Sequence, residues 1–220
     1  MGPRSVAAVT ASIATCFSAN SLANSRLPGA NQLVVAPDDP SKMLLRATFG
    51  LLITHDAGVT WDWLCESATG SGGTQDPAVA LLNGGAVLSG QVEGLATSPD
   101  LGCSWSFVAG TAKVPIADVT RSRDGTSGLA IENLYTATSD AGVLLYDSSV
   151  LETTNAAQSW QALPGVIDPT LAIQTIDWAP NDPQRIYVTG IVFGQDHATM
   201  LVSHDGGQSY APFPIPFITN

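Results

Sequence analysis

Six acidic residues in predicted loops carry the side-chain type that glycoside hydrolysis requires: Glu66, Asp76, Glu93, Asp140, Asp168 and Asp196. That reaction uses two carboxyl groups on either side of the bond to be cleaved, one as proton donor and one as base or nucleophile. Acidic residues on solvated loops usually only face water, and Asp76-Pro77 and Asp168-Pro169 have the pattern of turn starts. The carboxylates are therefore candidates for glycoside hydrolysis, and the alternative is that they are ordinary turn and surface residues.

The three histidines, at positions 55, 197 and 204, have no spacing that would make a zinc cluster, and Asp196-His197 is one isolated pair. The stretch from Gly70 to Gly73 is rich in glycine, but it lacks the Lys and the following helix of a phosphate-binding loop. No strand-turn-helix pattern surrounds a nucleophilic serine. The sequence thus predicts no metal site and no cofactor, and it favours a non-catalytic protein over an enzyme.

One short pattern occurs four times: Ser or Thr, any residue, Asp, any residue, Gly, any residue, Ser or Thr, and an aromatic residue. The copies cover residues 54–61, 98–105, 153–160 and 203–210. In such a pattern the Asp side chain accepts hydrogen bonds from backbone N–H groups two or three residues on, Gly permits positive φ, and the hydroxyl closes the turn. The aromatic residue starts the next strand and packs over the turn. Each copy therefore predicts a hairpin turn with structural roles for its residues, His55 and His204 included.

The residues assigned to these turns are Asp56, Gly58, Trp61, Asp100, Gly102, Trp105, Asn155, Trp160, Asp205, Gly207 and Tyr210. The third copy departs from the pattern, because Asn155 replaces Asp and Ala157 replaces Gly. Tyr210 stands where the other copies have Trp. Since Ala at positive φ costs about 1 kcal/mol, we expect the third turn to be the weakest.

The pattern resembles the Asp-box, or bacterial neuraminidase repeat, of β-propellers. Residues 31–216 or so resemble exported bacterial propellers of the sortilin-like and photosystem-assembly-factor-like group. The resemblance implies an all-β fold of four-stranded antiparallel blades that binds a protein or glycan partner, with no binding residue that can be carried over. The spacing of about 50 residues between copies suits one copy per blade. We expect blades at about 31–67, 78–109, 116–163 and 173–215, within a domain of residues 26–220.

Each predicted blade has two ends. The first-to-second and third-to-fourth turns share one end, because successive antiparallel strands reverse direction, so the Asp-boxes lie there. The opposite end carries the connections between blades and the irregular loops, where we expect function. The candidate binding residues at that end are Glu66, Asp76, Glu93, Asp140, Asp147, Asp168, Asp196 and His197.

Two enzyme classes share the resemblance. Sialidase-like propellers hold the substrate carboxylate with three arginines, but this chain has no Arg-Ile-Pro motif, and Arg123 and Arg185 fall at the box end. Asp-box propellers that cleave β-glucans use paired carboxylates in a cleft between two large propellers, whereas four blades are predicted here. The prediction is therefore a non-catalytic scaffold that binds its partner through the loops opposite the boxes, with a glycoside hydrolase as the alternative.

Composition and the N-terminal residues bear on compartment and partners. With 8 basic and 19 acidic residues, the net charge of −11 disfavours nucleic acids and anionic membranes as partners. Arg4, a stretch of small residues over 5–19 and the small-x-small triplet Ser21-Leu22-Ala23 predict a signal peptide over residues 1–25. No later run approaches about 20 apolar residues, so no membrane span is predicted. We expect an extracytoplasmic protein, whether secreted, periplasmic or on the cell surface.

Cys65 and Cys103 remain after removal of such a signal peptide. Oxidising compartments favour a disulfide between two remaining cysteines. In regular blades, however, the two would lie near opposite ends, about 13 Å apart by strand rise alone, which is beyond disulfide reach. The sequence leaves both alternatives open.

The number of blades bears on self-association. Four blades are few for a closed ring, and no split final blade is evident in the sequence. The chain is expected to be either a truncated member of a family with six or more blades or an open array. Free strand edges in an open array would favour association between copies.

Overall fold

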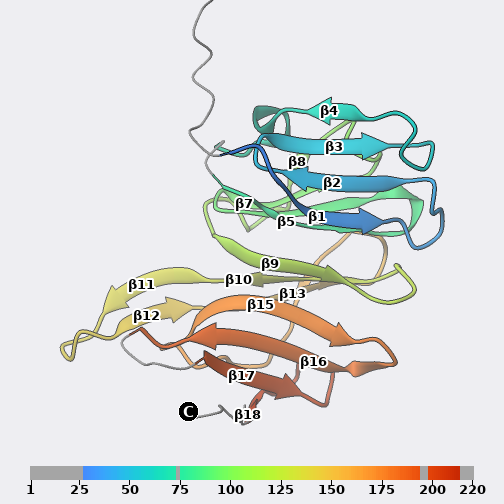
Figure 1. Ribbon diagram of the computed structural model, residues 1–220. Coiled ribbons are helices and arrows are strands. Elements are labelled where there is room, and N and C mark those ends of the chain that lie inside the picture. Colours follow the sequence, from blue (N-terminus) through green and yellow to red (C-terminus); the bar gives the residue numbers. More distant parts are fainter. Residues whose placement is uncertain (1–26, 73–74, 194–197, 214–220) are drawn as a thin grey trace, which may run out of the picture.

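The computed structural model describes residues 27–72, 75–193 and 198–213, and most of them form four antiparallel sheets (Figure 1). Blade one comprises β1 (Ala30–Val35), β2 (Met43–Ala47), β3 (Gly50–Thr54) and β4 (Asp62–Leu64). Blade two comprises β5 (Ala78–Leu81), β6 (Val87–Gln91), β7 (Gly94–Ser98) and β8 (Ser106–Phe107). Blade three comprises β9 (Ile116–Arg121), β10 (Gly128–Glu132), β13 (Val150–Thr153) and β14 (Gln161–Ala162). Blade four comprises β15 (Ala172–Ala179), β16 (Asp182–Ile191), β17 (Ala198–Ser203) and β18 (Ala211–Phe213).

Three further elements lie in the connections. Two short 3-10 helices, η1 (Glu66–Thr69) and η2 (Asn83–Gly85), follow β4 and β5. A separate two-stranded sheet, β11 (Leu134–Thr138) with β12 (Leu144–Asp147), is inserted between the second and third strands of blade three. The predicted all-β class with four-stranded antiparallel blades is confirmed. The predicted signal peptide and the pair Asp196-His197 lie outside the described residues.

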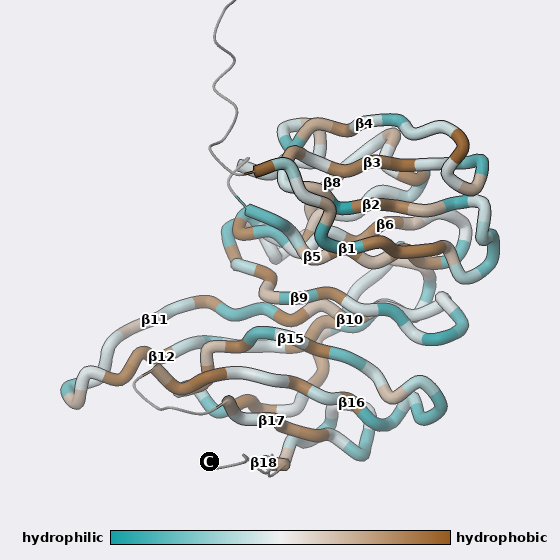
Figure 2. The backbone as a smooth tube through the Cα atoms, viewed as in Figure 1, coloured by the Kyte–Doolittle hydropathy of each residue, from teal (hydrophilic) through white to brown (hydrophobic). Residues whose placement is uncertain are grey.

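The strands of each blade are paired in chain order, and consecutive blades pack face to face through their first strands, β1 on β5, β5 on β9, and β9 on β15. Three apolar clusters fill the spaces between them. Leu44 and Ile53 of blade one meet Leu81 of blade two, and similar clusters join blades two and three and blades three and four. Figure 2 shows apolar residues along the strands and hydrophilic ones at most turns. Burial of one such Leu or Ile side chain stabilises the folded chain by about 1.5–3 kcal/mol. The packing between blades therefore holds the blades, and the loops attached to them, in place.

The outer face of blade one is also apolar, but no described blade covers it. Leu33 pairs with Leu45, Leu45 with Leu52, and Leu52 with Trp63, so the four side chains form a row across all four strands. Leu33 is 55% exposed and Trp63 is 61% exposed. Blades one and four stand at the two ends of the stack (Figure 1), and the described blades therefore form an open series.

The four repeated segments, which we call boxes, form the turns between the third and fourth strands of their blades, and their hydrogen bonds differ in one detail from those expected. In the first box, Thr60 donates from its backbone N–H to Asp56 Oδ1 (2.8 Å) and from its hydroxyl to Asp56 Oδ2 (2.6 Å). These donors lie four residues beyond the Asp rather than two or three. The N–H of Gly58 instead donates to the Thr54 hydroxyl (2.9 Å), which in turn donates to Asp56. The backbone N–H groups of the turn are thus accepted partly by the Asp carboxylate and partly by the first Ser or Thr hydroxyl.

The charged form of the box Asp is favoured by these bonds. Hydrogen bonds from the Thr60 hydroxyl and backbone lower the pKa of Asp56 from 3.8 to about 2. The hydroxyls of Ser209 and Ser203 lower the pKa of Asp205 to about 2 in the same way. Asn155 takes the place of the carboxylate in the third box: its Oδ1 accepts from Ser159 N, and its Nδ2 donates to the Ser159 hydroxyl (2.8 Å).

Each box is also joined to the first turn of its own blade. The residue after the box Asp or Asn donates its backbone N–H to a carbonyl of that turn, at distances of 2.8–3.1 Å. The four pairs are Ala57 to Ser41, Leu101 to Gly85, Ala156 to Thr126 and Gly206 to Gln184. The two turns of a blade therefore share one end, which we call the box end, and we call the other the loop end.

Candidate functional site

The described candidate residues all lie at the loop end, but on different blades. Glu66 is in η1, Asp76 precedes β5, Glu93 lies between β6 and β7, Asp140 lies between β11 and β12, Asp147 ends β12, and Asp168 precedes β15. Among them, Asp76 accepts from Asn31 Nδ2, Glu93 from Gly72 N and Gln75 Nε2, and Asp168 from Thr170 N.

Several of these carboxylates hold their own loops. Glu93 accepts from the backbone N–H of Gly72 (3.1 Å) and from Gln75 Nε2 (2.6 Å), across the connection between blades one and two. Asp168 Oδ1 accepts from both the N–H and the hydroxyl of Thr170 (2.8 Å each), as a turn-starting Asp does. A cavity beside Glu66 has a volume of only about 10 Å³, which is about the space of one water molecule.

The most prominent feature of the loop end is the β11–β12 hairpin, which projects beyond the blades (Figure 1). Tyr135 and Tyr146 pair across it edge to face, with ring centroids 6.1 Å apart and planes at 73°. Tyr135 is 52% exposed. The backbone of Tyr146 is joined to the body, because its N–H donates to the carbonyl of Pro169 (2.7 Å). Within the described chain β11 pairs only with β12, so its other edge is open.

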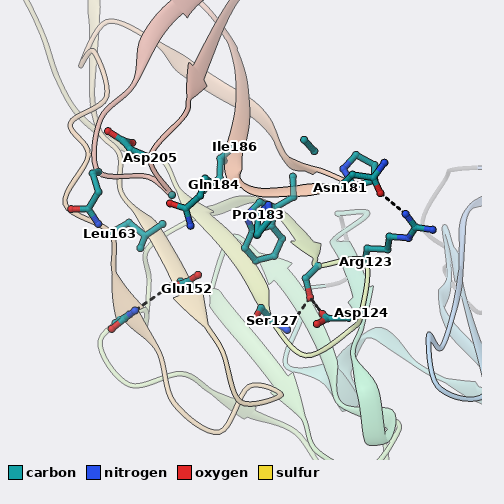
Figure 3. A pocket seen from close by; sticks show the side chains of 17 residues that line it. Arg123, Asp124, Ser127, Glu152, Leu163, Asn181, Pro183, Gln184, Ile186 and Asp205 are labelled. Atoms are coloured by element: carbon teal, nitrogen blue, oxygen red, sulfur yellow. Dashed lines mark hydrogen bonds between the residues drawn. The ribbon is translucent and has the colours of Figure 1, made fainter.

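A cavity of about 740 Å³ lies at the other end of the molecule, between blades three and four (Figure 3). Blade three contributes Ser122, Arg123, Asp124, Ser127, Glu152, Gln161 and the following Leu163. Blade four contributes Trp178, Ala179, Pro180, Asn181, Pro183, Gln184, Ile186, Asp205, Gly206 and Gln208. Its volume falls within the usual range for small-molecule sites.

The first turns of neighbouring blades explain why the cavity forms here. At the first two junctions these turns touch closely: Gly84 N donates to Asp38 Oδ2 (2.8 Å), and Asn83 N donates to the carbonyl of Gly125 (2.9 Å). At the third junction a long side chain makes the connection, as Arg123 donates to Asn181 Oδ1. The first turns of blades three and four are therefore joined through side chains.

The fourth box adds to the same space. Leu101, which follows the Asp of the second box, is 5% exposed and packs between blades one and two. Gly206 occupies the equivalent position in the fourth box and has no side chain to offer between blades three and four. Both residues have positive φ, 53° for Leu101 and 67° for Gly206. The cavity between blades three and four thus includes the volume that the Leu101 side chain fills between blades one and two.

The polar residues around the cavity are only partly engaged. Gln161 Nε2 donates to Glu152 Oε2 (3.0 Å). Asp124 Oδ1 accepts from Ser122 and Thr126, whose bonds lower its pKa. In the described part of the chain, the side-chain amides of Gln184 and Gln208 have no hydrogen-bond partner, and both residues are exposed. Leu163, Trp178 and Ile186 are buried beneath these groups.

One half-buried carboxyl stands apart from both ends. Asp118, on β9, accepts from the backbone N–H groups of Ile176 (3.0 Å) and Val119 (2.9 Å), so it joins the first strands of blades three and four. Burial raises its pKa above the usual value. Its two backbone donors indicate a structural role between blades.

The sequence interpretation missed the cavity. A signal existed in Ser122-Arg123-Asp124-Gly125, which places at a first turn the same Ser-x-Asp-Gly order that begins the fourth box. That this turn lies beside residues 180–183 could not be known from the sequence, because the two turns belong to different blades.

Cys65 and Cys103 are exposed free thiols in the structure, and Cys65 Sγ lies 3.2 Å from the Ser67 hydroxyl oxygen. Among the residues that the structure describes, no cluster of three or more His, Cys, Asp or Glu side chains is suited to a metal ion. The described helices are too short to cross a bilayer.

No protein-family model matches the sequence, and none of the curated proteins matches it either. Solved structures do match. A GH74 xyloglucanase from Xanthomonas campestris is 18% identical, with a TM-score of 0.60 over 84% of this chain and 30% of that chain. An ancestral GH74 enzyme is 14% identical, with a TM-score of 0.60 over 86% of this chain and 24% of that one. A Hadza microbial sialidase is 14% identical, with a TM-score of 0.52 over 86% and 46%.

These structures are β-propellers, so the chain has the fold of β-propeller blades. It spans less than half the length of each of them. At such low identity the likeness concerns the fold alone.

Proposed function

We propose that this chain is a non-catalytic, exported propeller module that binds a protein partner through its loop end, with the β11–β12 hairpin as the main contact. The observation that carries the proposal is the projection of this hairpin, with its exposed Tyr135 and the open edge of β11. An open edge offers unpaired N–H and C=O groups to an extended segment of a partner, and an aromatic side chain beside it offers contact area. Export rests on the signal-peptide pattern of residues 1–25.

Charge favours a basic partner segment. Asp140 lies in the turn between β11 and β12, Asp147 ends β12, and both are exposed. The chain as a whole carries a net charge of −11. Complementary charge speeds association and excludes wrong partners, so Lys or Arg beside the extended segment would suit this surface.

The loop carboxylates support a binding role over a hydrolytic one. Glu93 and Asp168 are engaged by groups of their own loops, as described above, and the candidates are spread over several blades. A glycosidase needs two carboxyl groups that face one bond. Hydrolysis of a β-glucan panel, lost when Glu66 or Asp140 is neutralised, would favour the alternative of a glycoside hydrolase.

The test is capture of partners from the native secretome on the immobilised chain, quantified by mass spectrometry. One variant replaces residues 136–145 by a short Gly-Ser turn, and a second carries Tyr135→Ala, with Tyr135→Phe as its conservative counterpart. The matched control carries His55→Ala and His204→Ala at the box end. We expect one enriched protein to be lost with the first two variants and kept with Tyr135→Phe and the control. Equal capture by the hairpin variant and the intact chain would contradict the proposal.

A further inference from the structure

The cavity between blades three and four plays no part in the proposed function, since it lies at the box end, away from the hairpin. We infer that this cavity is a second binding site and that it takes an uncharged saccharide. Its volume of about 740 Å³ suits a small ligand rather than a folded partner. Figure 3 shows the labelled side chains arranged around it, with Glu152 and Asp205 on one side and Arg123 and Asp124 on the other.

The charges around the cavity disfavour an anion. One cation, Arg123, stands against three acids, Asp124, Glu152 and Asp205. Hydrogen bonds keep Asp124 and Asp205 ionised, so the lining has an excess of negative charge at neutral pH. A carboxylate, sulfate or phosphate would meet repulsion there.

Four of the six carboxylate oxygens of these acids already accept hydrogen bonds. Asp205 Oδ1 accepts from Ser203 (2.7 Å) and from Ser209 N (3.0 Å), and its Oδ2 accepts from the Ser209 hydroxyl (2.6 Å). Asp124 Oδ1 is likewise engaged by its own turn. An ammonium ligand needs carboxylate oxygens that are free to approach it, and both oxygens of Asp205 and one oxygen each of Asp124 and Glu152 are already engaged.

Free amides remain as the groups that can recognise a ligand. Gln184 and Gln208 have no side-chain partner within the described residues, and Gln161 uses only one of its amide hydrogens. Each amide presents a donor and an acceptor, and a sugar hydroxyl is both an acceptor and a donor. The C–H faces of a sugar ring would rest over Leu163 and Pro183. An amide-rich, apolar-floored cavity therefore fits a neutral saccharide better than a charged one.

Gly206 provides the means to fill part of the cavity without replacing any of these glutamines. Leu101 shows that the equivalent box position accepts a leucine at positive φ. A Cβ built on Gly206 would lie 3.0 Å from Gln184 Oε1, the end of a flexible side chain that can shift. Gly206→Leu should therefore fill part of the cavity while the box turn is kept.

The experiment titrates the chain with the neutral trisaccharides cellotriose, xylotriose, mannotriose and maltotriose, with sialyllactose as an anionic probe and the glucosamine trimer as a cationic one. Calorimetry measures binding, and tryptophan fluorescence reports on the cavity through Trp178. The variants are Gly206→Leu and the pair Gln184→Ala with Gln208→Ala. The control is His204→Ala, which is exposed on the same turn and does not line the cavity.

We expect at least one neutral trisaccharide to bind with a millimolar or lower Kd. Gly206→Leu should abolish this binding, the glutamine pair should weaken it about tenfold or more, and His204→Ala should leave it unchanged. The inference is overturned if no neutral probe binds, if only a charged probe binds, or if folded Gly206→Leu binds as well as the intact chain. If Gly206→Leu does not fold, unchanged binding by the exposed glutamine variants overturns it.

Discussion

Arg123 of blade three donates a hydrogen bond to the side-chain carbonyl of Asn181 in blade four, and this bond joins the two first turns across the cavity. At the other two junctions a backbone N–H is the donor, from Gly84 to the Asp38 carboxylate and from Asn83 to the carbonyl of Gly125. The third junction is therefore held by two side chains, which mutation can remove without altering the backbone.

The junction can be tested by a double-mutant cycle. We expect Arg123→Ala and Asn181→Ala to couple by about 0.5–1 kcal/mol in the free energy of unfolding, because the bond is exposed and one partner is neutral. Urea unfolding measures the four species. Arg121 bonds within its own turn, so Arg121→Ala should add to Asn181→Ala without coupling. Additive effects for the Arg123 pair would show that the bond contributes nothing.

Restoring glycine at position 157 should stabilise the turn of the third box. Ala157 has a φ of 66°, which costs a residue with a Cβ about 1 kcal/mol. Ala157→Gly should therefore raise the urea midpoint, by up to about 1 kcal/mol in stability. Ala141 is exposed in a turn and is not among the residues with positive φ, so Ala141→Gly should give no gain. A lower midpoint for Ala157→Gly would contradict the account.

Acid should weaken the boxes that hold a carboxylate. The pKa of both Asp56 and Asp205 is about 2 in the folded chain, below the usual 3.8. Folding therefore favours the ionised form, and the stability this provides is present above about pH 4 and is lost as the pH falls toward 2.

Denaturant midpoints between pH 5 and pH 2 or so measure this dependence. The double variant Asp56→Asn with Asp205→Asn should flatten it, whereas Asn155→Asp should steepen it by adding a carboxylate to the third box. An unchanged slope in both variants would rule out the boxes as its source.

The outer face of blade one should drive association between copies. Trp63 and Leu33 are more than half exposed within an apolar row, and contiguous apolar patches of this kind mark association surfaces. Trp63→Ser should lower the apparent mass in light scattering at high protein concentration. Val59 is 81% exposed but lies on a box turn, off this face, so Val59→Ser should have no such effect. A chain that is monomeric at every concentration would contradict the prediction.

The sequence was sufficient for features that depend on local chemistry. The end of β3 at Thr54 follows from the sequence, because the box that begins there sets where the hairpin turns. The pairing of first turns with box turns at one end follows from strand reversal alone.

Features that depend on contacts between blades were not predictable in this way. The β11–β12 hairpin, which starts at Leu134, was not predicted, because cross-strand pairs such as Tyr135 with Tyr146 form only in the folded chain. The cavity depends on Gly206 and Arg123, which are far apart in the sequence and meet across two blades.

The hydrogen bond between each box and the first turn of its blade makes the box end of a blade more resistant to local opening than the loop end. At the box end all four strands are fastened together by backbone hydrogen bonds such as that from Leu101 to Gly85. Local opening should therefore begin at the loop end, and amide hydrogens there should exchange first. The same asymmetry explains where new sequence can enter: the β11–β12 insertion extends from the unfastened end of blade three, where added residues do not disturb the sheet.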